Sequence, residues 1–366
     1  MNPYWNRRVR KLEPYVPGEQ PRGRKFIKLN TNENPYPPSP KVLEAIRGAA
    51  GDLRLYPDPA CTALREAIAE AAGVKPAQIF AGNGSDEVLA FVFAAFFQAP
   101  DPVLFPDITY SFYPVYAGLW DLPFETPPLT GDFRIDPADY RRPSGGVIVP
   151  NPNAPTGILL EPGALLSLAE DLARQNRVLV VDEAYGLFAG PGAHSLLGAA
   201  SLVPHIEAHP NLLTVHTFSK MASLAGLRVG FAIGNEALIE ALCRVRDSFN
   251  SYPLDALAQA GAAAAAADGA YRAETAARIR AQRERVTGAL RERGFETLPS
   301  AANFIFTRRP GIRGADLSAA LRERGILVRR FDGPRTGDFL RVTIGAAEDM
   351  DAFLEALDAA LAAGRA

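Results

Sequence analysis

Short apolar runs alternate with longer amphipathic segments along the first two thirds of the chain. The runs are Ile79–Phe80, Val103–Phe105, Val147–Val149, Val178–Val181, Leu212–Val215 and Val229–Ile233. Short runs separated by helical segments are typical of strands in a parallel sheet whose two faces are covered by helices. The pattern therefore predicts an α/β fold with a mostly parallel central sheet and helices on both faces.

Several of the predicted strands end in polar or glycine-containing segments. These segments are Ala81–Glu87, Pro106–Tyr110, Asn151–Gly157, Asp182–Tyr185 and Thr217–Lys220. Open α/β sheets bind their ligands at the carboxyl ends of the strands. We therefore expect these segments to converge on one pocket.

The last third of the chain has a different composition. Residues 255–290 are rich in alanine and then in arginine and glutamate, which favours a long helix. Beyond Gly294 the pattern predicts a compact α+β module with strands at Asn303–Phe306, Ile326–Val328 and Phe339–Ile344 and helices at Ala315–Arg324 and Met350–Ala362. We predict a large domain at 41–255 and a smaller domain made from 1–40 and 256–366.

The charge balance excludes some classes of partner. The 366 residues include 39 basic and 41 acidic ones, so the formal charge is −2. This balance leaves no excess of positive charge that would attract nucleic acid or an anionic membrane. The longest apolar run, Val88–Phe97, is far shorter than the roughly 20 residues of a membrane span, and the opening residues contain no signal-peptide core. We expect a cytoplasmic protein whose partners are small molecules.

Neither the cysteines nor the histidines form a metal or redox motif. Cys61 and Cys243 are far apart in the sequence, and His205 and His209 lie four residues apart without a third ligand. Because zinc sites need three or four protein ligands, we predict no metal site and two reduced thiols.

Lys220 stands at the end of a predicted strand, in Thr217-Phe218-Ser219-Lys220, and Arg228 follows eight residues later. A lysine in an apolar neighbourhood loses its proton more readily and can form an imine with a carbonyl. Ser219 and Arg228 are suited to hold a phosphate, the arginine through two charge-assisted hydrogen bonds. A single lysine is usually a solvated surface residue, so the interpretation depends on the surrounding motif.

Asp182 follows the apolar strand Val178–Val181 directly, and Tyr185 comes three residues later. A buried aspartate keeps the ring nitrogen of pyridoxal 5′-phosphate (PLP) protonated, which that cofactor needs in order to store electrons. An acid at a strand end can also be a magnesium ligand beside a P-loop, but the chain contains no P-loop sequence.

The segment Gly82–Glu87 leads from a short strand into an apolar helix. A helix N-terminus reached through glycines offers free N–H groups to a phosphate. The segment is not the dinucleotide fingerprint, because Glu87 holds the place of the third glycine. Tyr110, at another strand end, can stack on a flat ring or simply pack in the core.

Together these segments resemble the fold-type-I PLP-dependent aminotransferases of class II, over nearly the whole chain. The resemblance implies that Lys220 forms the imine and shuttles the proton, that Asp182 holds the ring nitrogen, that Tyr185 contacts the ring oxygen, and that Tyr110 stacks on the ring. The cofactor-binding residues that it implies are Ser85, Asp86, Glu87, Tyr110, Asn153, Asp182, Tyr185, Ser219, Lys220, Arg228 and Tyr56.

The chain departs from the family at one position. The family often reads Asn-Asn-Pro-Thr-Gly, whereas Ala154 stands beside the proline here. We therefore expect Asn153 to provide the amide contact to the cofactor.

The two ends of the chain resemble the histidinol-phosphate aminotransferases. The segments that carry this resemblance are Val9–Tyr15, Leu29–Tyr36 and Tyr56–Asp58. It implies a homodimer in which Tyr56 reaches the partner's cofactor phosphate, and a substrate site that includes Tyr15 and Asn34.

Two arginines near the C-terminus complete the expected substrate site. By the same resemblance, Arg341 binds the α-carboxylate of glutamate, and Arg329 contacts the substrate phosphate. Planar guanidinium groups suit both anions, although an arginine at a strand end is more often a surface ion-pair partner.

The sequence thus predicts an aminotransferase that acts on L-histidinol phosphate and 2-oxoglutarate. Two alternatives share the scaffold, an aromatic amino-acid aminotransferase and a threonine-phosphate decarboxylase. A non-catalytic PLP-fold binding protein is a more distant alternative, because such a protein is expected to lack the lysine or the aspartate.

Overall fold

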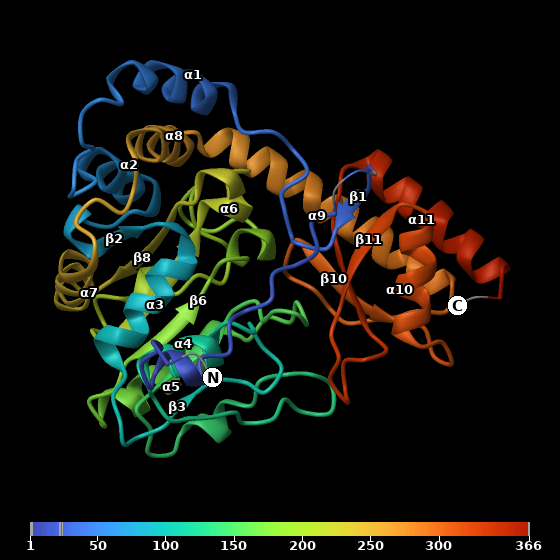
Figure 1. Ribbon diagram of the computed structural model, residues 1–366, viewed down its shortest axis with the longest axis horizontal. Helices are drawn as coiled ribbons and strands as arrows, with labels where there is room; N and C mark the ends of the chain where they lie inside the picture. The colour runs from blue at the N-terminus through green and yellow to red at the C-terminus, as the bar shows by residue number, and fades with distance from the viewer. Residues whose placement is uncertain (1–2, 22, 24, 365–366) are drawn as a thin grey trace.

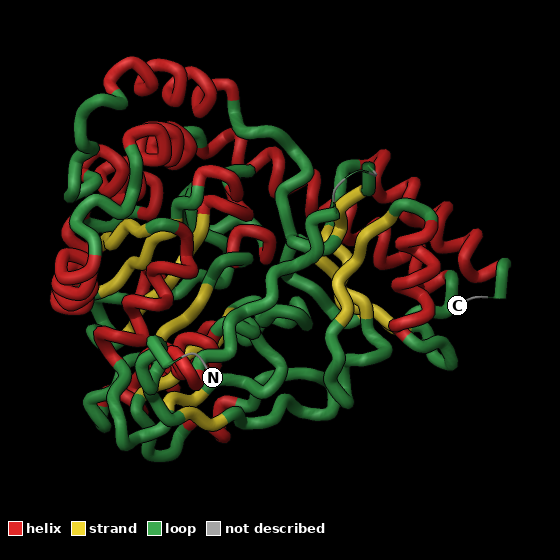
Figure 2. Tube along the Cα trace, viewed as in Figure 1, coloured by secondary structure: helices red, strands yellow, loops and turns green. Residues whose placement is uncertain are grey.

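The computed structural model describes residues 3–21, 23 and 25–364, which form two β-sheets covered by helices (Figures 1 and 2). The larger sheet has seven strands, in the order β2-β8-β7-β6-β5-β3-β4. Their bounds are β2 Ile79–Gly82, β8 Gly230–Gly234, β7 Leu212–Thr217, β6 Leu179–Asp182, β5 Gly146–Pro150, β3 Val103–Leu104 and β4 Phe124–Glu125.

The central strands of this sheet are parallel, as the sequence predicts. Strands β7, β6, β5, β3 and β4 pair in parallel, whereas β8 is antiparallel to both β2 and β7. Successive residues of β6 alternate between two buried clusters, with Leu179 and Val181 in one and Val180 in the other. A sheet that is buried on both faces explains why its strands read as continuous apolar runs rather than as alternating ones.

Helices cover both faces of the large sheet. One face packs on α3 (Gly84–Phe96), α4 (Tyr113–Trp120) and α7 (Glu236–Phe249). The other packs on α2 (Thr62–Ala72), α5 (Pro162–Ala173) and α8 (Ala256–Ala267), with α1 (Pro40–Ala49) lying against α8.

The alanine-rich region forms two helices rather than the single long helix that its composition favours. Helix α8 ends at Ala267, and α9 spans Gly269–Glu292. Asp268 between them is non-helical, with φ −93° and ψ 61°. The buried guanidinium of Arg272 donates to the carbonyls of Ala265 and Ala266 at the end of α8, so the break leaves these two groups satisfied. Helix α9 then runs from the large sheet to the small one (Figure 1).

The smaller sheet has five strands, in the order β1-β11-β12-β10-β9. They span Ile27–Leu29, Ile326–Arg330, Leu340–Thr343, Phe304–Arg308 and Glu296–Thr297, and α10 (Gly314–Glu323) and α11 (Ala347–Ala362) pack beside them. The N-terminal strand β1 pairs in parallel with β11, so that Ile27 lies beside Ile326. Residues from both ends of the chain therefore build this sheet.

In the described part of the chain, none of the helices has both the length and the apolar character needed to cross a membrane.

Candidate active site

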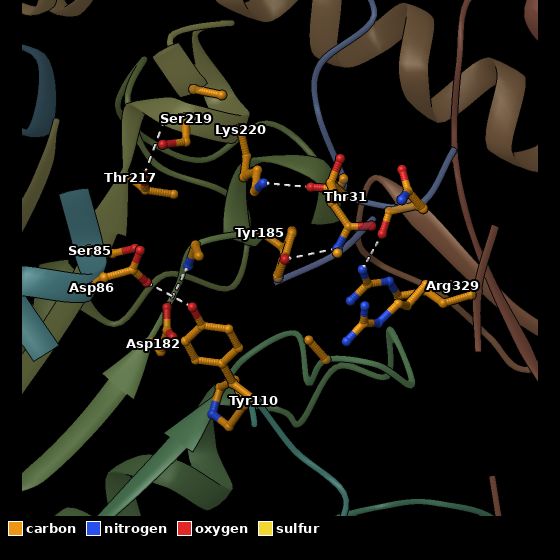
Figure 3. A pocket seen from close by; sticks show the side chains of 18 of the residues that line it. Thr31, Ser85, Asp86, Tyr110, Asp182, Tyr185, Thr217, Ser219, Lys220 and Arg329 are labelled. Carbon is orange, nitrogen blue, oxygen red and sulfur yellow. Dashed lines mark hydrogen bonds between the residues drawn. The ribbon is translucent and has the colours of Figure 1, made fainter. Parts of the chain in front are cut away.

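A cavity of about 180 Å³ lies where the carboxyl ends of the parallel strands face the small sheet (Figure 3). The large sheet contributes Pro150 from β5, Asp182 from β6 and Thr217 from β7. The segments that follow the large-sheet strands add Tyr110, Ala154, Ala184, Tyr185, Ser219, Lys220, Ala225 and Arg228. The start of helix α3, the N-terminal segment and the small sheet complete the wall with Ser85, Asp86, Tyr15, Gly18, Asn30, Thr31, Asn32, Arg329 and Arg341. The strand-end segments thus meet in one place.

Lys220 lies in the single-turn helix α6 (Phe218–Met221), directly after β7. Its Nζ points into the cavity and donates to the carbonyl oxygen of Thr31 at 2.9 Å (Figure 3). Burial, and after it the positive charge of Arg341, lowers the pKa of Lys220 to about 8. At pH 7 roughly a tenth of the amine is therefore unprotonated, far more than for an ordinary lysine, and a nucleophile or a base requires this form.

Asp182 is the last residue of β6 and is only 5% exposed. Its Oδ2 accepts from the Tyr113 hydroxyl at 3.0 Å, and its Oδ1 accepts from the Ala184 N–H at 3.1 Å. Burial raises the pKa of Asp182 to about 6, although both hydrogen bonds act in the opposite direction. Because no cation among the described residues forms an ion pair with it, this carboxylate is suited to a cationic group in the cavity.

Tyr185 lies in the loop after β6, with its ring edge-on to Phe304 at a centroid distance of 5.0 Å. Its hydroxyl oxygen accepts a hydrogen bond from Nδ2 of Asn32 at 2.9 Å. Burial raises the pKa of Tyr185, so the hydroxyl keeps its proton at neutral pH. Tyr185 is therefore a neutral group that faces the same space as the amine of Lys220.

One end of the cavity, here called the α3 end, is formed by Ser85, Asp86, Ser219 and Arg228. The Arg228 guanidinium donates to Oδ2 of Asp86 at 3.0 Å and to Oγ of Ser219 at 3.3 Å. The Tyr110 hydroxyl donates to Oδ1 of Asp86 at 2.7 Å. Hydroxyls, a guanidinium and the N-terminus of a helix whose N-cap residue makes no side-chain cap are groups that can hold an anion.

The backbone at the α3 end is packed too closely for side chains. A Cβ on Gly84 would lie 2.5 Å from Nη2 of Arg228, and a Cβ on Gly230 would lie 2.2 Å from the backbone nitrogen of Ser85. Arg228 itself has a φ of 56°, a left-handed conformation that is uncommon for arginine. Such strain is typical of functional sites, where the surrounding structure holds it.

The other end of the cavity, here called the β12 end, is formed by Arg329 and Arg341. These arginines lie opposite each other in the β11–β12 pair. Nη2 of Arg341 donates to the carbonyl of Asn30 at 2.9 Å, while its buried Nε has no hydrogen-bond partner in the described part of the chain. Neither arginine forms an ion pair with a carboxylate of the described residues. Since like charges placed opposite each other are destabilising, the arrangement favours a bound anion.

Tyr15 reaches the cavity from the N-terminal segment and stacks on Phe112 at a centroid distance of 4.5 Å. Asn34 does not line the cavity. Its Nδ2 donates to the backbone carbonyl of Lys220 at 3.1 Å, so it holds the main chain of the lysine.

Asn153 lies behind the cavity wall, which is lined by Ala154 instead. The Nδ2 of Asn153 donates to the Ile108 carbonyl at 3.0 Å and to the Thr156 hydroxyl at 3.1 Å. In this arrangement the amide holds the loop, and Asn153 is not among the residues that line the cavity.

Glu87 and Tyr56 also lie outside the cavity. Oε2 of Glu87 accepts from the Asn83 N–H at 2.6 Å, which caps the first turn of α3. Tyr56 is 84% exposed and stacks on Tyr252 at a centroid distance of 4.8 Å.

Thr31, Asn32 and Tyr113 hydrogen-bond to Lys220, Tyr185 and Asp182, respectively, and none of them is assigned a role from the sequence. Thr31 and Asn32 belong to the polar run at 30–34, of which only Asn34 was assigned. Tyr113, three residues after Tyr110, was an available signal because an aspartate buried at a strand end needs a donor. In the described part of the chain, no group of three or more histidine, cysteine or acidic residues could hold a metal ion.

Residues 24–357 match the family of class I and II aminotransferases. The chain is 55% identical, over 361 residues, to histidinol-phosphate aminotransferase 1 from Bordetella parapertussis, with 98% of each chain covered. It is 53% identical, over 360 residues, to histidinol-phosphate aminotransferase from Pseudomonas putida, with 98% of this chain and 100% of that protein covered.

Among solved structures, the fold is similar to that of histidinol-phosphate aminotransferase from Sinorhizobium meliloti in complex with pyridoxal-5′-phosphate. The TM-score is 0.86 and the identity 26%, with 99% of both chains covered. Aspartate aminotransferase from Thermus thermophilus with maleate matches with a TM-score of 0.79 at 23% identity, covering 96% of this chain and 98% of that one. At that identity the likeness shows the fold alone, and the fold is that of the fold-type-I aminotransferases.

Proposed function

The chain belongs to the class I and II aminotransferases, and on that premise we propose that it moves an amino group between L-histidinol phosphate and 2-oxoglutarate with PLP as its cofactor. The observation that carries the proposal is the surroundings of Lys220. Its amine shares one cavity with a carboxylate that lacks a cationic partner and with two arginines that lack an acidic one, as judged over the described residues.

The side chains of the cavity fit this cofactor. Asp182 suits a protonated ring nitrogen, because it is buried with neutral donors only. The α3 end suits the phosphate, and Tyr110 suits the ring face. When bound, PLP supplies an aldehyde carbon that takes up the amino group and a protonated ring that stores the electron pair left by the α-proton.

Lys220 is the group that moves the proton. As a free base, its Nζ would remove the α-proton of the amino donor, hold it as an ammonium, and return it at the carbon on the other side of the amino nitrogen. The pKa of about 8 keeps the amine close to the pH at which it must both accept and release that proton. The Thr31 carbonyl, 2.9 Å from Nζ, holds the amine in the cavity between these transfers.

The β12 end accounts for the two substrates. Glutamate carries an α-carboxylate, which Arg341 can bind through two parallel hydrogen bonds. Histidinol phosphate has no carboxylate but carries a phosphate, which Arg329 and Arg341 can bind together with Tyr15. One cationic surface thus serves both halves of the reaction in turn.

The test compares purified enzyme on L-histidinol phosphate, phenylalanine and threonine phosphate, with 2-oxoglutarate as acceptor. We expect kcat/KM for histidinol phosphate to exceed that for phenylalanine by about 10- to 100-fold, because the phosphate gains charge-assisted hydrogen bonds. Phenylalanine as the best donor would contradict the proposal, as would carbon dioxide release from threonine phosphate as the main reaction.

The same proposal includes a homodimer in which Tyr56 completes the partner's site. Large apolar side chains lie exposed at residues 53–56 and 249–252, and they are Leu53, Leu55, Tyr56, Phe249 and Tyr252. Contiguous exposed apolar residues of this kind are typical of protein interfaces. Light scattering should give twice the chain mass, and Tyr56→Phe should weaken cofactor binding while the dimer persists.

We further propose that the two sheets are the cores of two domains, with boundaries near residues 40 and 255. Support comes from the topology. Strand β1 lies in one sheet with β9, β10, β11 and β12, and this sheet shares no strand with the larger one. The cytoplasm is the proposed location, where the unpaired thiols of Cys61 and Cys243 are expected to stay reduced.

A further inference from the structure

Tyr185 receives a hydrogen bond from a residue of the N-terminal segment, far from it in the sequence. Asn32, in the segment between β1 and α1, donates from Nδ2 to the Tyr185 hydroxyl at 2.9 Å. Figure 3 shows this hydrogen bond as the dashed line that reaches the Tyr185 oxygen, close to Lys220 and Thr31. The N-terminal segment therefore contacts both the amine and the phenol of the site.

The amide of Asn32 is fixed in one orientation. Its backbone N–H donates to Oγ1 of Thr343 at 2.9 Å, and the Thr343 hydroxyl donates in turn to Oδ1 of Asn32 at 3.1 Å. Because Oδ1 is an acceptor there, the NH₂ group must be the one that faces Tyr185. Asn303 adds a donor to the Asn32 carbonyl at 3.0 Å, and Asn32 is 1% exposed.

This network determines where the hydroxyl proton of Tyr185 can point. Its oxygen already accepts from Asn32, so its own proton must point elsewhere. The described residues offer that hydroxyl no other hydrogen-bond partner, and the ring lines the cavity. The proton of Tyr185 is thus presented to whatever molecule occupies the cavity.

We propose that Asn32 is a positioning residue of the transamination reaction, which commits Tyr185 to act as a hydrogen-bond donor toward the cofactor's ring oxygen. Asn32 thereby supplies an amide to Tyr185 from the N-terminal segment. The cavity wall itself carries Ala154, which belongs to the apolar cluster that Tyr185 packs against. The inference rests on the proposed function, because it assumes that Tyr185 faces the cofactor.

The consequence is a change in the basicity of the lysine–cofactor imine. A donor to the ring oxygen stabilises the negative charge there and weakens the hold of that oxygen on the neighbouring imine proton. A hydrogen bond received by Tyr185 strengthens the one that it donates. Asn32 is therefore expected to lower the pKa of the imine.

Other charged groups also face this region and stay unchanged in the variants below. Arg341, Asp182 and Tyr15 act on Tyr185, and Arg341, Glu33, Asp86 and Arg228 act on Lys220. Differences between variants therefore report on Asn32 and Tyr185 alone.

The experiment is a pH titration of the visible absorbance of the holoenzyme. The variants are Asn32→Gly, Tyr185→Phe and the double variant, because glycine tolerates the φ of 55° found at Asn32. We expect Tyr185→Phe to raise the imine pKa by about one unit and Asn32→Gly by about half a unit. In the double variant the pKa should equal that of Tyr185→Phe, since Asn32 acts through the phenol.

Asn211→Gly is the matched control, because the Asn211 amide also donates hydrogen bonds, to the carbonyls of Ala169 and Arg177, but does so away from the cavity. It should lower the melting temperature and leave the imine pKa unchanged. Should Asn32→Gly not fold, Asn32→Asp keeps the size and the acceptor but cannot donate, and it should raise the pKa at least as much.

An unchanged pKa in a folded Asn32 variant, with the Tyr185→Phe shift intact, would overturn the inference and leave the proposed function standing. The inference would also be overturned if adding Asn32→Gly to Tyr185→Phe raised the imine pKa as much as Asn32→Gly raises it in the wild-type enzyme. If Tyr185→Phe left the imine pKa unchanged, Tyr185 could not be assigned to the cofactor, and the inference would fail with that assignment.

Discussion

At the α3 end of the cavity, Arg228 is paired with Asp86 at 3.0 Å, whereas at the β12 end Arg329 and Arg341 face each other without a carboxylate partner among the described residues. Both ends are suited to anions. The α3 end is preorganised by its own hydrogen bonds, including those of Tyr110 and Ser219 to the ion pair. At the β12 end, by contrast, Nε of Arg341 is buried without a hydrogen-bond partner among the described residues, and neither arginine has an acidic partner there.

The difference matches what each end has to bind. A cofactor that stays in place through both half-reactions needs a rigid site that is complete without the substrate. Two substrates that exchange at each turnover need cations whose partner is the substrate itself. The unpaired arginines are costly in the free enzyme, and that cost favours binding of either anion.

The largest expected effect comes from Lys220, which lies between the two ends. Lys220→Ala should lower kcat by about 10⁴-fold or more, because one amine both forms the imine and moves the proton. The cofactor should still bind without a covalent bond, since the α3 end is intact. Activity assays and absorbance spectra check both expectations. The control is Lys41→Ala, because Lys41 is an exposed lysine that pairs with Asp268. Turnover near the wild-type rate would exclude Lys220 as the reacting amine.

Removing one arginine from each end tests the comparison directly. Arg228→Ala should weaken cofactor binding by about 10- to 100-fold and leave KM for glutamate nearly unchanged at saturating cofactor. Arg341→Ala should raise KM for glutamate by a similar factor and leave cofactor release unchanged. If both variants altered the same constant, the two ends would not be separate sites.

A smaller effect is expected at Arg329. Arg329→Ala should raise KM for histidinol phosphate by about 10-fold, since the phosphate loses one charge-assisted donor, with little change for glutamate. Steady-state kinetics on both substrates measure the split. An equal rise for the two would show that both arginines bind one common anion position.

The smallest effect concerns the pH dependence of cofactor attachment to the apoenzyme. Only the unprotonated amine attacks the aldehyde, so the attachment rate should rise with pH through a midpoint near about 8 rather than the ordinary 10.5 of a lysine. Because the positive charge of Arg341 lowers the pKa of Lys220, Arg341→Ala should move the midpoint upward. A midpoint that stays in place would show that burial alone sets it.

Most of the large sheet follows from local patterns. The runs that become β5, β6 and β7 are continuously apolar and contain β-branched residues, so their strands are evident in the sequence. The two-residue strands β4 and β9 carry no periodicity and form only through pairing with neighbours. The break at Asp268 depends on the distant packing of Arg272, which helix propensity does not contain.

The residues of the site also fall into two groups, those that local sequence patterns reveal and those whose roles depend on tertiary contacts. Lys220 and Asp182 are recognisable because each follows an apolar strand within one short motif. The role of Asn32 depends on Thr343, 311 residues away, and on Tyr185, 153 residues away. The position of Asn153 behind the wall depends on its loop partners Ile108 and Thr156. Contacts of this kind are tertiary, and no local spacing encodes them.

The pairing of β1 with β11 sets an order of events during synthesis. Residues 27–29 leave the ribosome early, but their partners at 326–328 are made about 300 residues later. At about 5–20 residues per second, the wait is roughly 15 to 60 seconds. Until then Thr31 and Asn32 have no fixed position, so a nascent chain can complete the large sheet and still lack a finished catalytic centre.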